Sequence, residues 1–239
     1  MVDAEQQFVQ PGIDQVAMDL MRKYNLDGKA TVYNTYQAYL KCTPDVLHGH
    51  LQQAAKEKFT MGVKLVRGAY INSEPRRIIH DVKQDTDDEY NCIARELLSK
   101  TYRELGTGTG ADDGGFPDVH LFLATHNQES TIKAFELQRD RAAKDLPLVP
   151  TRYGQLLGMA DEVSCTLLQL KDPEVEAKGP RFVSPEAYKC LSWGTLADCI
   201  SYLIRRAVEN RDAVSRTKAE YYALRREVWR RMKAAVGLS

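Results

Sequence analysis

The stretch Met61-Gly62-Val63-Lys64-Leu65-Val66-Arg67-Gly68-Ala69-Tyr70 decides how the fold of this chain is interpreted. Its β-branched and apolar residues, Val63 and Leu65 among them, predict a strand buried on both faces, and Gly68 suits a sharp turn at its end. Buried strands rarely carry cations, so Lys64 and Arg67 are expected to meet negative charge there. That charge comes either from acidic side chains, in structural ion pairs, or from a bound anionic group.

Length and composition indicate a globular protein without bulk charge. The 239 residues suffice for one large domain or two small ones, and Lys+Arg and Asp+Glu both number 33. A net charge of zero gives no argument for nucleic acid as a partner. No apolar run approaches the roughly 18 residues that span a bilayer, and the chain starts without a recognisable signal or transit peptide.

Neither cysteine nor histidine spacing predicts a metal site. The five cysteines form no C-x-x-C pair and have no close histidine, so reduced thiols in an intracellular compartment are expected. His48-Gly49-His50 has no acidic or cysteine partner at ligand spacing, and a surface loop is the favoured interpretation. We therefore expect no metal.

Short apolar runs alternate with segments of helical periodicity. Strands are predicted at 30–33, 63–66, 119–124 and 188–191. Helices are predicted at 11–25, 43–61, 86–98 (opened by a Thr86/Glu89 capping box), 131–139, 195–210 and 218–236. The glycines within 105–118 indicate a flexible insertion, since no Lys-Ser/Thr pair follows them as in a phosphate-binding loop.

This alternation predicts a parallel sheet, either doubly wound or closed into a barrel. Polar side chains stand at the carboxyl ends of nearly all expected strands, namely Asp3, Gln37, Arg67 with Tyr70, His126 and Cys190. A barrel collects functional groups from many strand ends in this way, whereas a doubly wound sheet concentrates them at one switch point and here lacks the G-x-G-x-x-G turn. The barrel is the favoured prediction.

The two C-terminal helices differ in character. In the helix at 195–210, Tyr202, Arg205, Arg206 and Glu209 share one face. The adjacent arginines could grip a carboxylate or phosphate, or the face could be solvated with an Arg205–Glu209 ion pair. The C-terminal segment 214–239 combines arginines with aromatic residues; it could contact an anionic membrane or nucleic acid, but an amphipathic helix packed on the domain is favoured.

Five segments, in this order, together resemble the proline dehydrogenase family, flavoenzymes that oxidise proline to pyrroline-5-carboxylate. They are Asp3-Ala4-Glu5-Gln6, Val63 to Tyr70, Ala124-Thr125-His126-Asn127, Gln155-Leu156-Leu157-Gly158-Met159, and Tyr202 to Asn210. The set covers almost the whole chain. Trp193-Gly194 and the glycine-containing insertion look most like the eukaryotic mitochondrial, fungal-like branch.

The resemblance implies a single domain over residues 1–239 with the fold of a distorted (β/α)8 TIM-type barrel. By the same resemblance Asp3 lies on the third barrel strand, so the chain is expected to hold strands 3–8 without the first two. The helix that bears Arg205 and Arg206 would lie over the barrel mouth. A chain of this extent is expected to be either an enzyme of this family or an inactive fragment that acts only as an interaction partner.

The resemblance also implies the site residues. FAD would be contacted by Gln37, Lys64, Val66, Arg67, Gly68, Ala69, Thr125, His126, Arg206 and Glu209. Catalysis would involve Asp3, Tyr70, Tyr202, Arg205 and Arg206. The substrate pocket would be formed by Leu156, Cys190, Tyr202, Arg205 and Arg206, the two arginines gripping the proline carboxylate.

The implied reaction is hydride transfer from proline to the N5 atom of FAD, with the electrons passed to a quinone. It is the first step of proline breakdown to glutamate, in the mitochondrion, at the inner membrane or on its matrix side. Cys190 stands where many family members have a tyrosine that packs against the substrate ring. The smaller side chain would widen the pocket, which makes hydroxyproline the alternative substrate.

Overall fold

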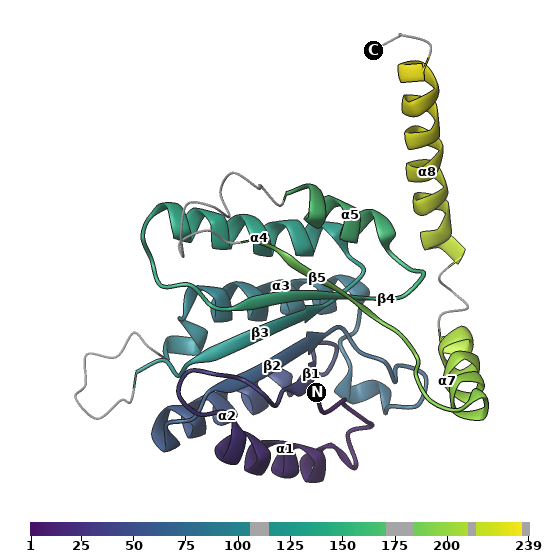
Figure 1. Ribbon diagram of the computed structural model, residues 1–239. Helices are drawn as coiled ribbons and strands as arrows, with labels where there is room; N and C mark the ends of the chain where they lie inside the picture. The colour runs from purple at the N-terminus through teal and green to yellow at the C-terminus, as the bar shows by residue number, and fades with distance from the viewer. Residues whose placement is uncertain (106–114, 171–183, 210–213, 236–239) are drawn as a thin grey trace.

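The computed structural model of the chain describes residues 1–105, 115–170, 184–209 and 214–235, and its element order is strictly alternating up to the last two helices (Figure 1). The strands are β1 (Asn34–Gln37), β2 (Met61–Val66), β3 (Val119–Ala124), β4 (Thr151–Leu156) and β5 (Glu186–Cys190). The α-helices are α1 (Gln10–Tyr24), α2 (Thr43–Glu57), α3 (Lys83–Ser99), α4 (Gln128–Ala143), α5 (Asp161–Gln169), α7 (Leu196–Glu209) and α8 (Val214–Ala235).

All five strands pair in parallel in the order β1-β2-β3-β4-β5. Figure 1 shows α1 and α2 below the sheet, α3 behind it and α4 and α5 above it, so that these helices surround one side of the sheet. No helix of the described residues lies over the opposite face. A doubly wound sheet has helices on both faces, so this arrangement confirms the barrel-type prediction.

The burial of successive residues alternates along β2 and distinguishes the face of the sheet that helices cover from the face that they leave open. Val63 and Leu65 of β2 are fully buried in the main core with apolar residues of the helices, whereas Lys64 and Val66 between and after them are half-buried. Successive side chains of a strand point to opposite faces. The inner face of β2 is therefore half-buried and not fully buried as predicted, because no described helix covers it.

The first strand begins four residues later than predicted. The side chain of Asn25, at the end of α1, accepts hydrogen bonds from the backbone N–H of Thr31 and Val32, each 2.8 Å, and donates to the Val32 carbonyl at 2.7 Å. Backbone groups bound to this side chain are not available for a strand ladder. The predicted strand at 30–33 is thus replaced by β1, which starts at Asn34.

Two local predictions were wrong at helices. The helix predicted to open with Thr86 starts at Lys83 instead, and Asp85 accepts a hydrogen bond from the backbone N–H of Val82 at 3.4 Å. His48 and His50 lie inside α2 and not in a surface loop. The Nδ1 atom of His50 is 2.8 Å from the Tyr36 hydroxyl, and burial lowers the pKa of this histidine.

The two edges of the sheet differ from the expected strands. Around Asp3 the structure has one parallel bridge, between Val2 and Asn34, in place of a full strand. β1 and β5 do not pair with each other within the described residues.

Most of the predicted insertion at 105–118 lies outside the described residues. Within the described part, no helix is both long and apolar enough to cross a lipid bilayer.

Candidate functional site at the carboxyl edge

The carboxyl ends of the five parallel strands are connected to one another by specific contacts. Gln37, the last residue of β1, accepts a hydrogen bond from the backbone N–H of Ala69, beyond β2, at 3.1 Å. His126, beyond β3, accepts from the backbone N–H of Leu156 at 3.1 Å. The Cys190 carbonyl accepts from the Leu157 N–H at 2.8 Å and so joins β5 to β4. The residues predicted from strand ends therefore lie along one edge.

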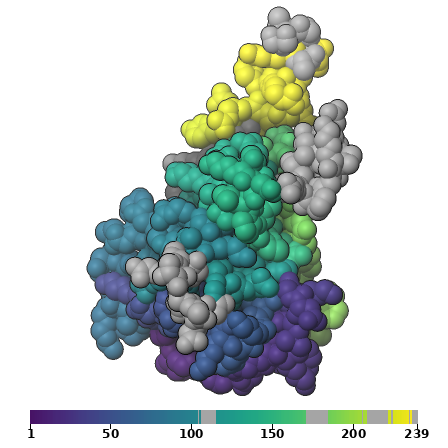
Figure 2. Space-filling model, turned by 90° about the vertical axis from the view of Figure 1, so that its left-hand side faces the viewer, coloured from purple at the N-terminus to yellow at the C-terminus, as the bar shows by residue number. Residues whose placement is uncertain are grey.

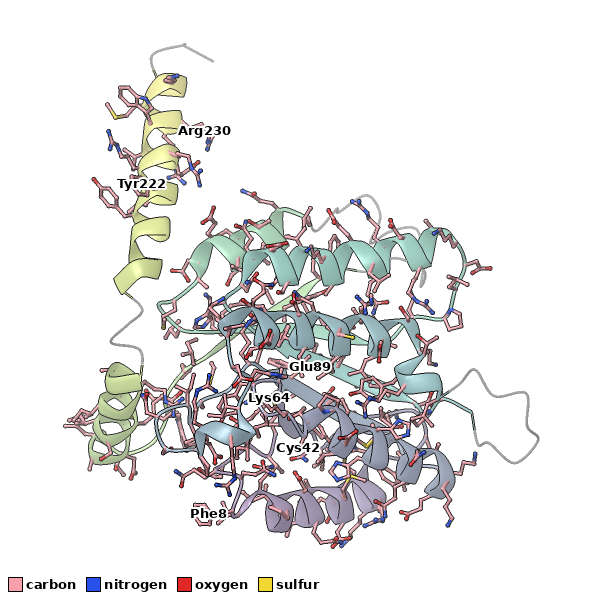
Figure 3. The ribbon with its side chains drawn as sticks, turned by 180° about the vertical axis from the view of Figure 1, so that it is seen from behind. Phe8, Cys42, Lys64, Glu89, Tyr222 and Arg230 are labelled. Atoms are coloured by element: carbon pink, nitrogen blue, oxygen red, sulfur yellow. The ribbon has the colours of Figure 1, made fainter. Side chains whose placement is uncertain are left out.

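Lys64 occupies the helix-free face of β2 (Figure 3). Its ammonium group forms an ion pair with the carboxylate of Asp3, and only 18% of the lysine side chain is exposed against 76% of the aspartate side chain. The cation is thus largely enclosed while its partner is largely in solvent. This is the Lys64–Asp3 pair, and it joins two residues predicted for the site.

Arg67 lies at the end of β2 inside a group of protein side chains. Its Nε donates to Asp87 at 2.5 Å, and its two terminal nitrogens donate to the hydroxyls of Thr125 at 2.6 Å and Ser130 at 2.9 Å. Its guanidinium carbon lies 4.3 Å from the centre of the Tyr90 ring, a cation–π geometry. We call these five residues the Arg67 cluster.

Asp87 remains ionised in the Arg67 cluster although only 13% of its side chain is exposed. Burial alone would raise the pKa of this carboxyl, but hydrogen bonds from Lys83 and Arg67, together with their charges, lower it below its usual value. The negative charge that the sequence required for Arg67 is therefore supplied by the protein. The structural ion-pair alternative holds for this arginine.

Gly68 follows the strand with a φ of +151°, a backbone conformation that favours glycine. A Cβ at this position would overlap the ring of Tyr39. Beside it, Gln37 is 3% exposed and uses both ends of its amide, accepting from Ala69 and donating to the Glu5 carbonyl at 3.1 Å. The turn after β2 is thus fixed by close packing and by one buried amide.

Helix α7 brings further predicted residues to this edge. Thr195 caps it, because its hydroxyl accepts from the Asp198 N–H at 3.3 Å. The Arg206 guanidinium lies 5.5 Å from the centre of the Tyr202 ring. Burial raises the pKa of Tyr202, as do the neighbouring Cys190 and Asp3, whereas Arg206 lowers it.

The remaining predicted residues fall into two groups. The Tyr70 hydroxyl donates to the Ala4 carbonyl at 3.4 Å, so this side chain contacts the segment that carries Asp3. Val66 and Leu156, both half-buried, end β2 and β4. The structure describes Arg205 and Glu209 only by their backbone, which belongs to α7, and not by their side chains.

Three residues of the site were missed in the sequence. Asp87, Tyr90 and Ser130 come from α3 and the first turn of α4 and enclose Arg67. The one available signal was the spacing of Lys83 and Asp87, four residues apart on a helix, where the lysine also pairs with the aspartate. No group of acidic, histidine or cysteine side chains suited to a metal ion is found in the described part of the chain.

Comparison with known proteins assigns the family. The model of the proline dehydrogenase family matches residues 1–219. The chain is 35% identical to a probable mitochondrial proline dehydrogenase of Schizosaccharomyces pombe, over 95% of this chain and 46% of that protein. It is 36% identical to a hydroxyproline dehydrogenase of Mus musculus, over 97% of this chain and 47% of that protein. The chain thus spans about half the length of these relatives.

A solved structure supports the fold. The proline utilization A protein (PutA) of Bdellovibrio bacteriovorus superposes with a TM-score of 0.63 at 20% sequence identity, covering 87% of this chain and 19% of that chain. At this identity the likeness concerns the fold alone, and it agrees with the parallel, barrel-type arrangement of β1 to β5. With the family match over most of its length, the chain belongs to the proline dehydrogenase family.

Proposed function

We propose that the protein takes part in FAD-dependent oxidation of L-proline to 1-pyrroline-5-carboxylate. The observation that carries this proposal is the Lys64–Asp3 pair, a largely enclosed cation on the helix-free face, near which α7 brings Tyr202 and Arg206. Family membership supports the same reaction. The protein would thereby carry out the first step of proline breakdown to glutamate.

The residues around the edge fit a flavin. A reduced flavin carries negative charge, and Lys64 offers a cation whose ionic partner among the described residues, Asp3, is 76% exposed and can be displaced. Arg67 has three of its five N–H donors engaged by the Arg67 cluster, so its part would be to hold Thr125 and the end of β2 in place. When bound, FAD would accept the hydride at its N5 atom.

The cofactor contacts proposed from the family resemblance follow the same edge. They are Gln37, Lys64, Val66, Arg67, Gly68, Ala69, Thr125, His126, Arg206 and Glu209. Gln37 supports the backbone of Ala69, and His126 supports that of Leu156. Backbone held in place by such hydrogen bonds would bind a large planar ligand with little reorganisation.

For the substrate we propose that Arg205 and Arg206 grip the proline carboxylate. A bidentate guanidinium contact fixes both the position and the tilt of a small carboxylate, which is the main requirement for hydride transfer. Tyr70, Tyr202 and Leu156 would shape the pocket around the ring, and Asp3 would lie close to the substrate. The amine of proline reacts in its neutral form, so little acid–base machinery is needed.

Hydroxyproline is the second candidate substrate. Cys190 is exposed at the end of β5 and contacts Tyr202, and relatives at 35–36% identity from mouse, rat and human are named hydroxyproline dehydrogenases. A short thiol leaves room for a hydroxyl on the ring. Replacing it by tyrosine should lower turnover of 4-hydroxyproline relative to proline; an unchanged or increased ratio in Cys190→Tyr would refute the widened pocket.

We propose a quinone as the electron acceptor and the mitochondrion, at the inner membrane or on its matrix side, as the compartment. The names of relatives from fission yeast, fruit fly and Arabidopsis include the word mitochondrial. The alternative is that the protein is inactive and acts only as an interaction partner.

The test is the visible spectrum of the purified protein after incubation with FAD. Retained flavin absorption that L-proline bleaches without oxygen, and that a soluble quinone restores, would support the proposal. A colourless protein that takes up no FAD would favour the inactive alternative. Bleaching by 4-hydroxyproline at a higher rate than by proline would select the second substrate.

A further inference from the structure

Helix α8 stands apart from the rest of the molecule. Figures 1 and 2 show it projecting beyond the layer formed by α4 and α5. Among the described residues, its side chains contact another element through the ion pair between Arg226 and Glu162 of α5, at 3.5 Å. The family match ends at residue 219, so most of α8 lies beyond it. The predicted packing of this helix on the domain was therefore wrong.

The large apolar side chains of α8 lie on one side of the helix. Leu224, Val228 and Met232 follow one another at four-residue spacing, and Trp229 and Tyr222 lie about 60–80° further around the helix axis than Met232. Each of these five residues is between 49% and 65% exposed. A helix face of this kind needs a partner, because it presents large apolar groups to water.

The other face of α8 is strongly basic. Over residues 221–235 the chain carries five cations against one acid, Glu227. Four of the cations lie on this face, namely Arg226, Arg230, Arg231 and Lys233, whereas Arg225 lies between Met232 and Trp229 on the apolar side. Glu227 already pairs with Arg230 and Arg231. Figure 3 shows Tyr222 and Arg230 on α8, with Arg230 in the half of the helix that projects away from the sheet.

We propose that α8 docks on the surface of a bilayer containing anionic phospholipids. A basic face beside an apolar face with tryptophan and tyrosine is the pattern of helices that lie in the membrane interface, where aromatic rings sit at headgroup depth. A second copy of the chain would bring five cations against five, which disfavours self-association. A nucleic acid would match the cations but leave the apolar side uncovered.

The two tryptophans of the sequence provide a direct readout. Trp193, before α7, is 92% exposed and Trp229 is 60% exposed, so each can report transfer out of water. The full chain is titrated with vesicles of phosphatidylcholine alone and of phosphatidylcholine mixed with phosphatidylglycerol. In Trp193→Phe, where Trp229 is the reporter, the emission should shift to the blue with the anionic vesicles only. In Trp229→Phe it should not shift.

Charge variants test whether vesicle binding depends on the cations of α8 or on the net charge of the whole protein. Arg225→Gln, Arg230→Gln and Lys233→Gln combined should weaken binding to anionic vesicles roughly 100-fold, since each cation near such a surface contributes about 1 kcal/mol. Glutamine keeps the helix propensity of the three positions. The matched control, Lys29→Gln, Lys56→Gln and Lys144→Gln, removes the same charge from exposed positions elsewhere and should bind like the wild type.

Several results would overturn the proposal. They are a blue shift reported by Trp193 instead of Trp229, equal binding to neutral and anionic vesicles, an equal loss in both charge variants, or binding to duplex DNA with none to vesicles. The readouts do not involve flavin or proline, so failure of this proposal and failure of the proposed enzymatic function are distinguishable.

Discussion

Lys64 in β2 and Arg67 directly after β2 lie three residues apart and have opposite surroundings. Arg67 is enclosed by Asp87, Thr125, Ser130 and Tyr90, so its charge is neutralised and its geometry fixed by the protein. Lys64 pairs, within the part of the chain that the structure describes, with the carboxylate of Asp3, which is mostly in solvent. From this difference we propose that Arg67 serves mainly the fold, whereas Lys64 would meet the ligand of the proposed function.

The largest effect on the fold is expected from Asp87→Ala. Removing this carboxylate leaves a largely buried guanidinium without its ionic partner, and losing one member of a buried pair costs about 3 kcal/mol or more. The free energy of unfolding, measured with denaturant, should fall by that amount. Lys83→Ala is the control, because Lys83 is 82% exposed and its loss should change stability little. Equal effects of the two variants would contradict a buried role for Asp87.

Gly68→Ala should come next in size. The new Cβ overlaps the Tyr39 ring and the backbone has a positive φ, so we expect a loss of roughly 2 kcal/mol of stability. The control is Gly49→Ala inside α2, where nothing lies within 4 Å of an added Cβ. Alanine there should instead stabilise the helix by about 0.5–1 kcal/mol. Stabilisation by both substitutions would rule out close packing at Gly68.

The pH dependence of stability tests the titration of Asp87, the ionic partner of Arg67. The pKa of Asp87 is lower in the folded protein than in the unfolded chain, so its contribution is complete above the unfolded value of about 3.9. That contribution is lost as the pH falls through the folded pKa. Unfolding free energies measured at decreasing pH should therefore decline less steeply in Asp87→Asn than in the wild type. Parallel curves would mean that Asp87 does not titrate in this window.

The smallest effect on stability is expected from Lys64→Met. Its ion pair has a largely exposed carboxylate, and such pairs contribute about 1 kcal/mol or less. Methionine also retains most of the apolar stem that lies on the sheet. Thermal unfolding should show nearly the wild-type midpoint. A loss as large as that of Asp87→Ala would place Lys64 in the same class as Arg67.

Much of the fold was predictable because it depends on local patterns. The alternation of apolar strands with helical periodicity predicted the parallel sheet, and polar residues at strand ends such as Gln37, Arg67 and His126 predicted its functional edge. The predicted first strand was shifted because the side chain of Asn25 binds the backbone that would have formed it. A side chain six or seven residues away that binds the backbone leaves no mark in the hydrophobic period of the sequence.

The sequence predicted which residues gather at this edge better than it predicted their contacts, and their functional roles stay a prediction. The charge of Arg67 demanded an anion, yet its partners lie 20, 58 and 63 residues away on other elements, and no spacing rule connects them. The face of α7 that carries Tyr202 and Arg206 was correctly predicted from helical spacing. The exposure of α8 could not be predicted, because an amphipathic pattern does not say what covers the apolar face.

The most direct test of the account is the rate at which L-proline reduces flavin in the FAD-loaded protein without oxygen, compared between wild type and Lys64→Met. If Lys64 meets the ligand, the variant should keep its stability and lose at least roughly 100-fold in this rate, as expected when one preorganised electrostatic contact is removed. Equal reduction rates in the two proteins would contradict the central claim, as would a folded wild type that binds FAD but is not reduced by proline.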